Sequence, residues 1–166
     1  MTNQPLADKL RPSSFDEIVG QAHLVSEKGV IRKMVNSGRI TNMIFFGPPG
    51  TGKTTVANII AKNSDMQLYR LNATTASLSD VKEVIAQSSN VFSTNGTLLY
   101  LDEIQYFNKK QQQSLLEFIE DGRITLICST TDNPYFSVYP AVLSRCSVFE
   151  FKSCDASEVK KALERA

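Results

Sequence analysis

The apolar residues of this chain fall into short runs, separated by longer segments in which they recur at helical spacing. Five short runs are typical of buried strands, at residues 42–46, 67–71, 97–101, 124–128 and 147–151. The spacing between them predicts helices, over residues 21–37, 55–62, 77–85, 111–120 and 141–143. Strands that alternate with helices predict an α/β fold, a mostly parallel sheet with helices on both faces.

The strongest chemical signal lies between the first predicted strand and the helix that follows it. The sequence GPPGTGKT at residues 47–54 fits the phosphate-loop pattern G-x-x-x-x-G-K-[ST] in its required strand–loop–helix context. Glycines allow backbone N–H groups to face phosphate oxygens, and a lysine and a threonine serve the terminal phosphates and Mg²⁺. We therefore expect ATP and Mg²⁺ as ligands, with Thr54 on the metal. The residues predicted to hold the nucleotide are Gly47, Pro48, Pro49, Gly50, Thr51, Gly52, Lys53, Thr54 and Thr55.

An acidic pair follows the third predicted strand. Asp102 and Glu103 come directly after the apolar run, at the carboxyl edge where parallel sheets form ligand crevices. Asp102 can hold Mg²⁺, and Glu103 can orient and deprotonate an attacking water. The alternative is an acidic pair that caps the next helix. The phosphate loop favours the catalytic interpretation.

Five further positions have both a structural and a functional interpretation. Thr130, Thr131 and Asn133 follow the fourth strand and could bond the γ-phosphate or the water, or could only form a turn. Asn72 ends the second strand, either as a turn residue or as a partner of Glu103. Arg145 is either half of a surface ion pair or an arginine finger, given to the γ-phosphate of a neighbouring subunit. The finger requires an oligomer.

The domain organisation follows from these elements. We expect one nucleotide-binding α/β domain at residues 1–152, in which residues 1–14 form an extended arm. The arm is either a frayed terminus or a flap over the bound base. Asp155-x-x-Glu158 caps a last helix. We interpret residues 153–166 as the truncated start of a helical lid.

Composition narrows the possible classes of protein only slightly. The 166 residues are 42% hydrophobic and 21% charged, which is ordinary for a globular domain. A formal net charge of +1 neither predicts nor excludes nucleic acid, because a local basic patch would suffice. Three cysteines without a C-x-x-C pair, with one histidine, do not predict a zinc site. The sequence shows neither a signal peptide nor an apolar run long enough for a membrane span, so we expect a cytoplasmic protein.

Several stretches together resemble the clamp-loader group of AAA+ ATPases, and within it the RarA/MgsA family. The discriminating stretches cover most of the chain, and they are PLA at residues 5–7, LRP at 10–12, VGQAHL at 19–24, FNKKQQ at 107–112, EDGRI at 120–124 and TTDNP at 130–134. The resemblance implies a five-stranded sheet of order 5-1-4-3-2. It implies that Thr130 senses the γ-phosphate, with Asn133 the second candidate, and that Asn72 restrains Glu103. It also implies that Arg145 is the arginine finger, and that Ile18 and Val19 line the adenine pocket with the arm.

The resemblance also implies a function. ATP hydrolysis would serve the maintenance of replication forks and recombination on forked, gapped or single-stranded DNA, near the nucleoid in a bacterium. The full-length protein would be a homo-oligomer, with replication proteins as further candidate partners and no membrane. Lys109 and Lys110 would contact DNA or simply begin a solvated helix. We expect this piece alone to bind nucleotide and hydrolyse it slowly. The alternatives are a clamp-loader subunit and a nucleotide-dependent scaffold with little turnover.

The chain departs from the family pattern at two places near the predicted site. Gln105 and Tyr106 stand where relatives carry His-Arg, which removes any contact made by that arginine. Cys128 and Ser129 replace the usual Gly-Ala before the threonines, and we expect from them only a mild change in packing.

Overall fold

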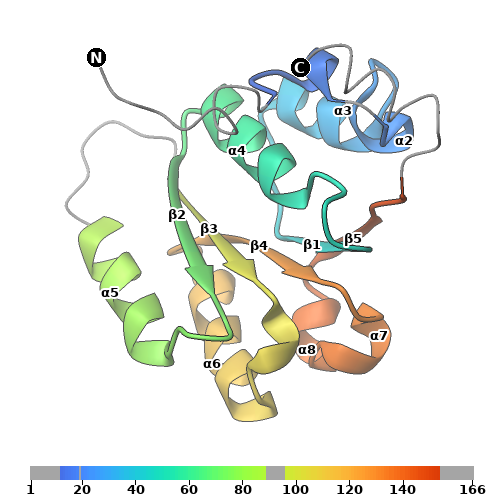
Figure 1. Cartoon of the computed structure of the whole chain (residues 1–166). Coiled ribbons are helices and arrows are strands. Elements are labelled where there is room, and N and C mark those ends of the chain that lie inside the picture. The colour runs from blue at the N-terminus through green and yellow to red at the C-terminus, as the bar shows by residue number, and fades with distance from the viewer. Residues whose placement is uncertain (1–11, 19, 89–95, 154–166) are drawn as a thin grey trace, which may run out of the picture.

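The computed structural model describes residues 12–18, 20–88 and 96–153. Its centre is a five-stranded sheet of order β2-β3-β4-β1-β5 in which every pairing is parallel (Figure 1). The strands are β1 (Met43–Phe46), β2 (Gln67–Asn72), β3 (Thr97–Asp102), β4 (Thr125–Thr130) and β5 (Ser147–Glu150). Read from the other edge, this is the predicted order 5-1-4-3-2. The α/β fold class is therefore confirmed.

Helices cover both faces of the sheet (Figure 1). One layer holds α2 (Ala22–Val25), α3 (Val30–Ser37) and α4 (Lys53–Asn63), and the other holds α5 (Leu78–Ser88), α6 (Lys109–Glu120) and α8 (Pro140–Leu143). Because strand side chains alternate between faces, Met43 and Phe45 pack with the first layer while Ile44 packs with the second. The sheet thus separates two buried cores.

The predicted helix over residues 21–37 is wrong, because the structure breaks it into α2 and α3. The chain turns at Ser26, whose carbonyl accepts a hydrogen bond of 2.7 Å from the N–H of Gly29. A Cβ at residue 29 would lie 2.4 Å from the backbone carbonyl of Leu24. Only glycine allows this close approach. Gly38 ends α3 in the left-handed conformation.

Two other differences come from caps that the apolar pattern does not reveal. The helix α6 begins at Lys109, earlier than predicted, because Asn108 and Gln111 form a reciprocal capping box. The short helix α7 (Pro134–Ser137) was not predicted, and Asn133 caps it by accepting a hydrogen bond from the N–H of Tyr135. Short 3₁₀ turns, η1 (Phe15–Glu17) and η2 (Ile104–Tyr106), complete the elements.

The predicted arm and lid fall largely outside the described residues, as does Val19. The boundaries of the arm and the lid therefore stay predictions. None of the helices in the described part of the chain has both the length and the apolar character that crossing a membrane requires.

Gly47, directly after β1, should be intolerant of any side chain. Its φ is 148°, and a Cβ there would lie 2.1 Å from the carbonyl oxygen of Phe151. We expect Gly47→Ala to destabilise the fold by about 2 kcal/mol or more beyond the usual cost of a positive φ, because neither backbone can move freely. Thermal unfolding without nucleotide measures this. The matched control is Gly38→Ala, which has a φ of 75° but no atom within 4 Å. An equal loss in both variants would contradict the steric explanation.

Candidate active site

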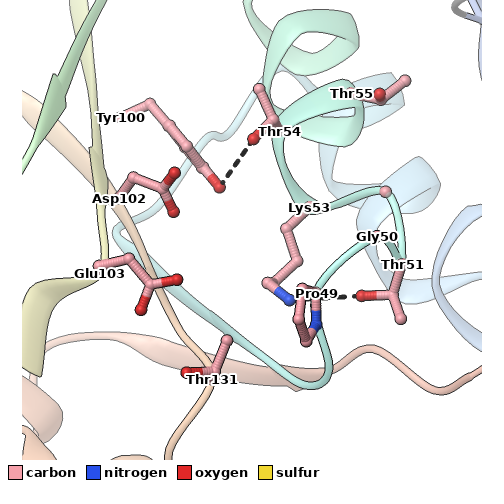
Figure 2. A pocket seen from close by; sticks show the side chains of 11 residues that line it. Pro49, Gly50, Thr51, Lys53, Thr54, Thr55, Tyr100, Asp102, Glu103 and Thr131 are labelled. Carbon is pink, nitrogen blue, oxygen red and sulfur yellow. Dashed lines mark hydrogen bonds between the residues drawn. The ribbon is translucent and has the colours of Figure 1, made fainter.

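A cleft of about 350 Å³ lies where the phosphate loop meets the carboxyl ends of the central strands (Figure 2). Its walls come from residues 49–55, from Tyr100, Asp102 and Glu103 at the end of β3, and from Thr131 after β4. The sheet order brings these segments together, because β4 lies between β1 and β3. Residues that the sequence places far apart thus face one cleft.

Lys53, the first residue of α4, is held by its own loop. Its side chain is buried, and Nζ donates hydrogen bonds of 2.7 Å to the carbonyls of Gly47 and Pro48 and one of 3.3 Å to Oγ1 of Thr51. Burial lowers the pKa of Lys53, whereas the nearby charges of Glu103 and Asp102 raise it. A phosphate in the cleft would therefore meet an ammonium that the loop already orients.

The next residue contributes a hydroxyl to the same wall. Oγ1 of Thr54 donates a hydrogen bond of 3.3 Å to the phenol oxygen of Tyr100. Burial raises the pKa of Tyr100 to about 12, against hydrogen bonds with Ser129 and Thr54 that lower it. The phenol is thus protonated at neutral pH.

The donor set fits Mg²⁺ that arrives with phosphate. The cleft offers the hydroxyl of Thr54 and the carboxylate of Asp102, and oxygen ligands of this kind are those that Mg²⁺ prefers. Within the described ranges, no group of three or more His, Cys, Asp or Glu side chains could hold a metal by itself. Phosphate oxygens and water would therefore complete the coordination of a metal here.

Glu103 has an unusual backbone conformation and points its carboxylate into the cleft (Figure 2). Its φ is 57° and ψ is 52°, in the left-handed region. Its N–H donates a hydrogen bond of 3.3 Å to Oγ of Ser129, and its Oε2 accepts a hydrogen bond from Nε2 of Gln105. The hydroxyl of Ser129 also donates to Oδ1 of Asp102. Ser129 and Gln105 are functional candidates that the sequence interpretation missed.

Of the predicted phosphate sensors, the structure brings Thr131 to the cleft rather than Thr130. Thr130 is fully buried, and its Oγ1 accepts a hydrogen bond of 3.0 Å from the N–H of Asp132. Side-chain alternation along β4 explains this, because Thr130 lies on the same face as Cys128, toward the α5–α6 layer. Asn133 caps α7. The role of Thr130 stays a prediction, and the geometry favours Thr131.

Asn72 lies beside the acidic pair, but its side chain accepts hydrogen bonds from Thr74. It pairs with Asp102 in the β2–β3 register. Its Oδ1 accepts hydrogen bonds from the N–H and Oγ1 of Thr74, at 2.9 and 2.7 Å. In the described part of the chain no hydrogen bond joins it to Glu103. Its predicted restraint of Glu103 therefore stays a prediction, and the carboxylate of Glu103 instead accepts a hydrogen bond from Gln105.

Arg145 does not line the cleft. It follows α8, and its side chain is 43% exposed and forms an ion pair of 2.5 Å with Glu120 at the end of α6. A further hydrogen bond of 3.0 Å joins Nη1 to the carbonyl of Ala141. The structure thus holds Arg145 on an outer surface.

A buried amide at the other end of the phosphate loop was also missed. Gln21 has a φ of 58°, and its Nε2 donates to the carbonyls of Lys152 at 2.6 Å and Thr51 at 3.3 Å. Its Oε1 accepts from the N–H of Lys152 at 2.9 Å. The amide therefore ties the phosphate loop to the segment after β5. Ile18, predicted to line the adenine pocket, packs against the core beside α2–α4.

Comparisons with known proteins agree with this geometry. Residues 43–153 match the ATPase family associated with various cellular activities (AAA). Over 163 residues the chain is 42% identical to Replication-associated recombination protein A of Haemophilus influenzae, covering 98% of this chain and 36% of that protein. Over 166 residues it is 38% identical to the protein of the same name from Escherichia coli K12, covering 99% and 37%. The chain thus spans little more than a third of the length of these relatives.

A solved structure with the same architecture is RuvB of Thermotoga maritima, described as a Holliday junction branch migration motor. The TM-score is 0.76 at 26% identity, and the match covers 94% of this chain and 53% of that one.

Proposed function

Since the chain belongs to the AAA family of ATPases, we propose that its cleft binds ATP with Mg²⁺ and hydrolyses the ATP to ADP and phosphate. The observation that carries the proposal is that two sets of functional side chains face each other across one cleft. Lys53 and Thr54 lie on the phosphate-loop wall, and Asp102 and Glu103 lie on the facing wall. The resemblance that the motifs predicted agrees with the relatives found.

Each side chain has a separate task. Lys53 offers its ammonium to the terminal phosphates, and the loop N–H groups add donors. Thr54 and Asp102 would hold Mg²⁺, which supplies charge neutralisation at the β- and γ-phosphates. Glu103 orients a water and accepts its proton as the water oxygen bonds to the γ-phosphorus and the bond from that phosphorus to the bridging oxygen breaks, which releases ADP. Thr131, which lines the cleft after β4, can donate a further hydrogen bond to the γ-phosphate.

We propose further that the whole protein acts on DNA at replication forks as a homo-oligomer. Support comes from relatives named for replication-associated recombination and from a neighbour named as a branch migration motor. Lys109 and Lys110 are exposed at the start of α6, and an N-terminal helix turn beside two lysines is suited to phosphate contacts. Such contacts would weaken as salt rises.

The test of the ATPase proposal uses Lys53→Ala. We expect it to weaken ATP binding about 10- to 100-fold, because charge-assisted bonds to phosphate are lost, and to reduce turnover to the level without protein. Calorimetry measures binding, and phosphate release measures turnover. The control is Lys62→Ala, which removes an exposed lysine from the last turn of the same helix. Equal ATP affinity in both variants would contradict the proposed site.

The same phosphate-release measurement with forked, gapped and single-stranded DNA tests the DNA proposal. Stimulation by DNA supports a motor or switch on forks. Opening of a sliding clamp would favour the clamp-loader alternative. Tight ATP binding without turnover in the oligomer would favour the scaffold.

A further inference from the structure

A buried hydroxyl joins the two carboxylate residues of the cleft. Ser129, in β4, is fully buried. It donates its hydrogen to Oδ1 of Asp102 and accepts the N–H of Glu103 at 3.3 Å. A serine hydroxyl has one hydrogen and two acceptor sites. Its donor hydrogen and one of its acceptor sites are therefore directed at the acidic pair.

The parallel register explains why this serine reaches the acidic pair. Leu101 pairs with Cys128 across β3 and β4, so the residues one step further, Asp102 and Ser129, also lie side by side. Alternation puts both on the face of α4, where Oγ1 of Thr54 donates to the phenol of Tyr100. The hydroxyl thus lies on the same side of the sheet as the proposed metal ligands.

The N–H that Ser129 accepts belongs to a residue in a disfavoured conformation. Glu103 has a φ of 57°, which an L-residue keeps only when its surroundings hold it. Ser129 holds its backbone, and Nε2 of Gln105 holds its carboxylate. Together they fix the two ends of Glu103.

We propose that Ser129 is a positioning residue for the ATPase reaction. It orients the Asp102 carboxylate toward Thr54 and keeps the backbone turn that directs Glu103 into the cleft. Gln105 completes the arrangement by fixing the orientation of the Glu103 carboxylate. The proposal rests on the proposed function, since it assigns a role within that reaction, and it gives a purpose to two departures from the family pattern.

The test is Ser129→Ala in the full protein, measured for ATP affinity, kcat and the Mg²⁺ concentration that gives half-maximal activity. We expect kcat to fall about 10- to 100-fold and the Mg²⁺ midpoint to rise, while ATP affinity without metal changes little. Ser129→Thr keeps a hydroxyl and should recover part of kcat. Gln105→Ala should lower kcat without moving the Mg²⁺ midpoint, because Gln105 bonds Glu103 and not Asp102.

The matched control is Cys128→Ala, the preceding residue in β4, equally buried but facing the α5–α6 layer. Thermal unfolding of all variants separates packing from positioning. The proposal is overturned if Ser129→Ala keeps both kcat and the Mg²⁺ midpoint, or if it loses activity only in proportion to its thermal stability, as Cys128→Ala would.

Failure of the proposed function gives a different result. If the wild-type oligomer binds ATP but does not hydrolyse it, the proposal that the protein is an ATPase is wrong. The Mg²⁺ dependence of ATP binding then tests whether Ser129 is a positioning residue. The same Mg²⁺ dependence in Ser129→Ala as in wild type overturns that role.

Discussion

Glu103→Gln is expected to leave ATP binding intact and to slow hydrolysis about 100- to 10,000-fold, the usual contribution of a general base. The amide is nearly isosteric with the carboxylate. Its oxygen can still accept the hydrogen bond that Gln105 donates to Glu103. Only the ability to take a proton from water is lost. The substitution therefore separates proton transfer from the geometry of the site.

Two measurements on the same preparation check this result. Equilibrium binding of ATP should match wild type, and single-turnover phosphate release should show the loss in the chemical step. The control is Glu117→Gln, which removes an exposed carboxylate from α6 outside the cleft. Unchanged turnover would remove Glu103 from its role. A parallel loss of ATP binding would instead indicate that its charge serves the nucleotide or the fold.

The fold was largely predictable because its determinants are local and repetitive. Apolar runs such as residues 97–101 are buried on both faces, as helix-covered parallel strands must be. The strand order came from the family resemblance rather than from periodicity. The helix break near Gly29 could not be foreseen, because it depends on a close approach to the backbone of Leu24. Periodicity carries no information about such a contact.

The site was predictable only where chemistry is carried by a contiguous motif. The phosphate loop and the acidic pair each follow one apolar run, and the sheet brings them together. Ser129 and Gln21 act through hydrogen bonds to residues distant in the sequence. Those contacts exist only once register and backbone conformation are set. Strand alternation also decides which threonine faces the cleft, and one residue of register separates Thr130 from Thr131.

Arg145→Ala is expected to reduce hydrolysis by the assembled protein on the order of 1,000-fold while barely changing the stability of the subunit. The ion pair with Glu120 is half exposed, and such pairs contribute about 1 kcal/mol or less. An arginine given to the γ-phosphate of a neighbour is worth far more to the transition state. The position of Arg145 outside its own cleft agrees with a role in a neighbouring site. The control is Arg123→Ala, which breaks a similarly exposed ion pair of 2.5 Å with Asp121.

Mixing variants tests whether the arginine acts between subunits. A Glu103→Gln subunit supplies Arg145 but has no base, and an Arg145→Ala subunit supplies the base but no arginine. If the arginine acts on a neighbour, mixed oligomers contain sites with Glu103 from one subunit and Arg145 from the next, so phosphate release should recover although neither variant is active alone. If it acts within its own subunit, every site lacks one group and mixing restores nothing. Equal activity of Arg145→Ala and Arg123→Ala would show that the pair with Glu120 is only a surface contact.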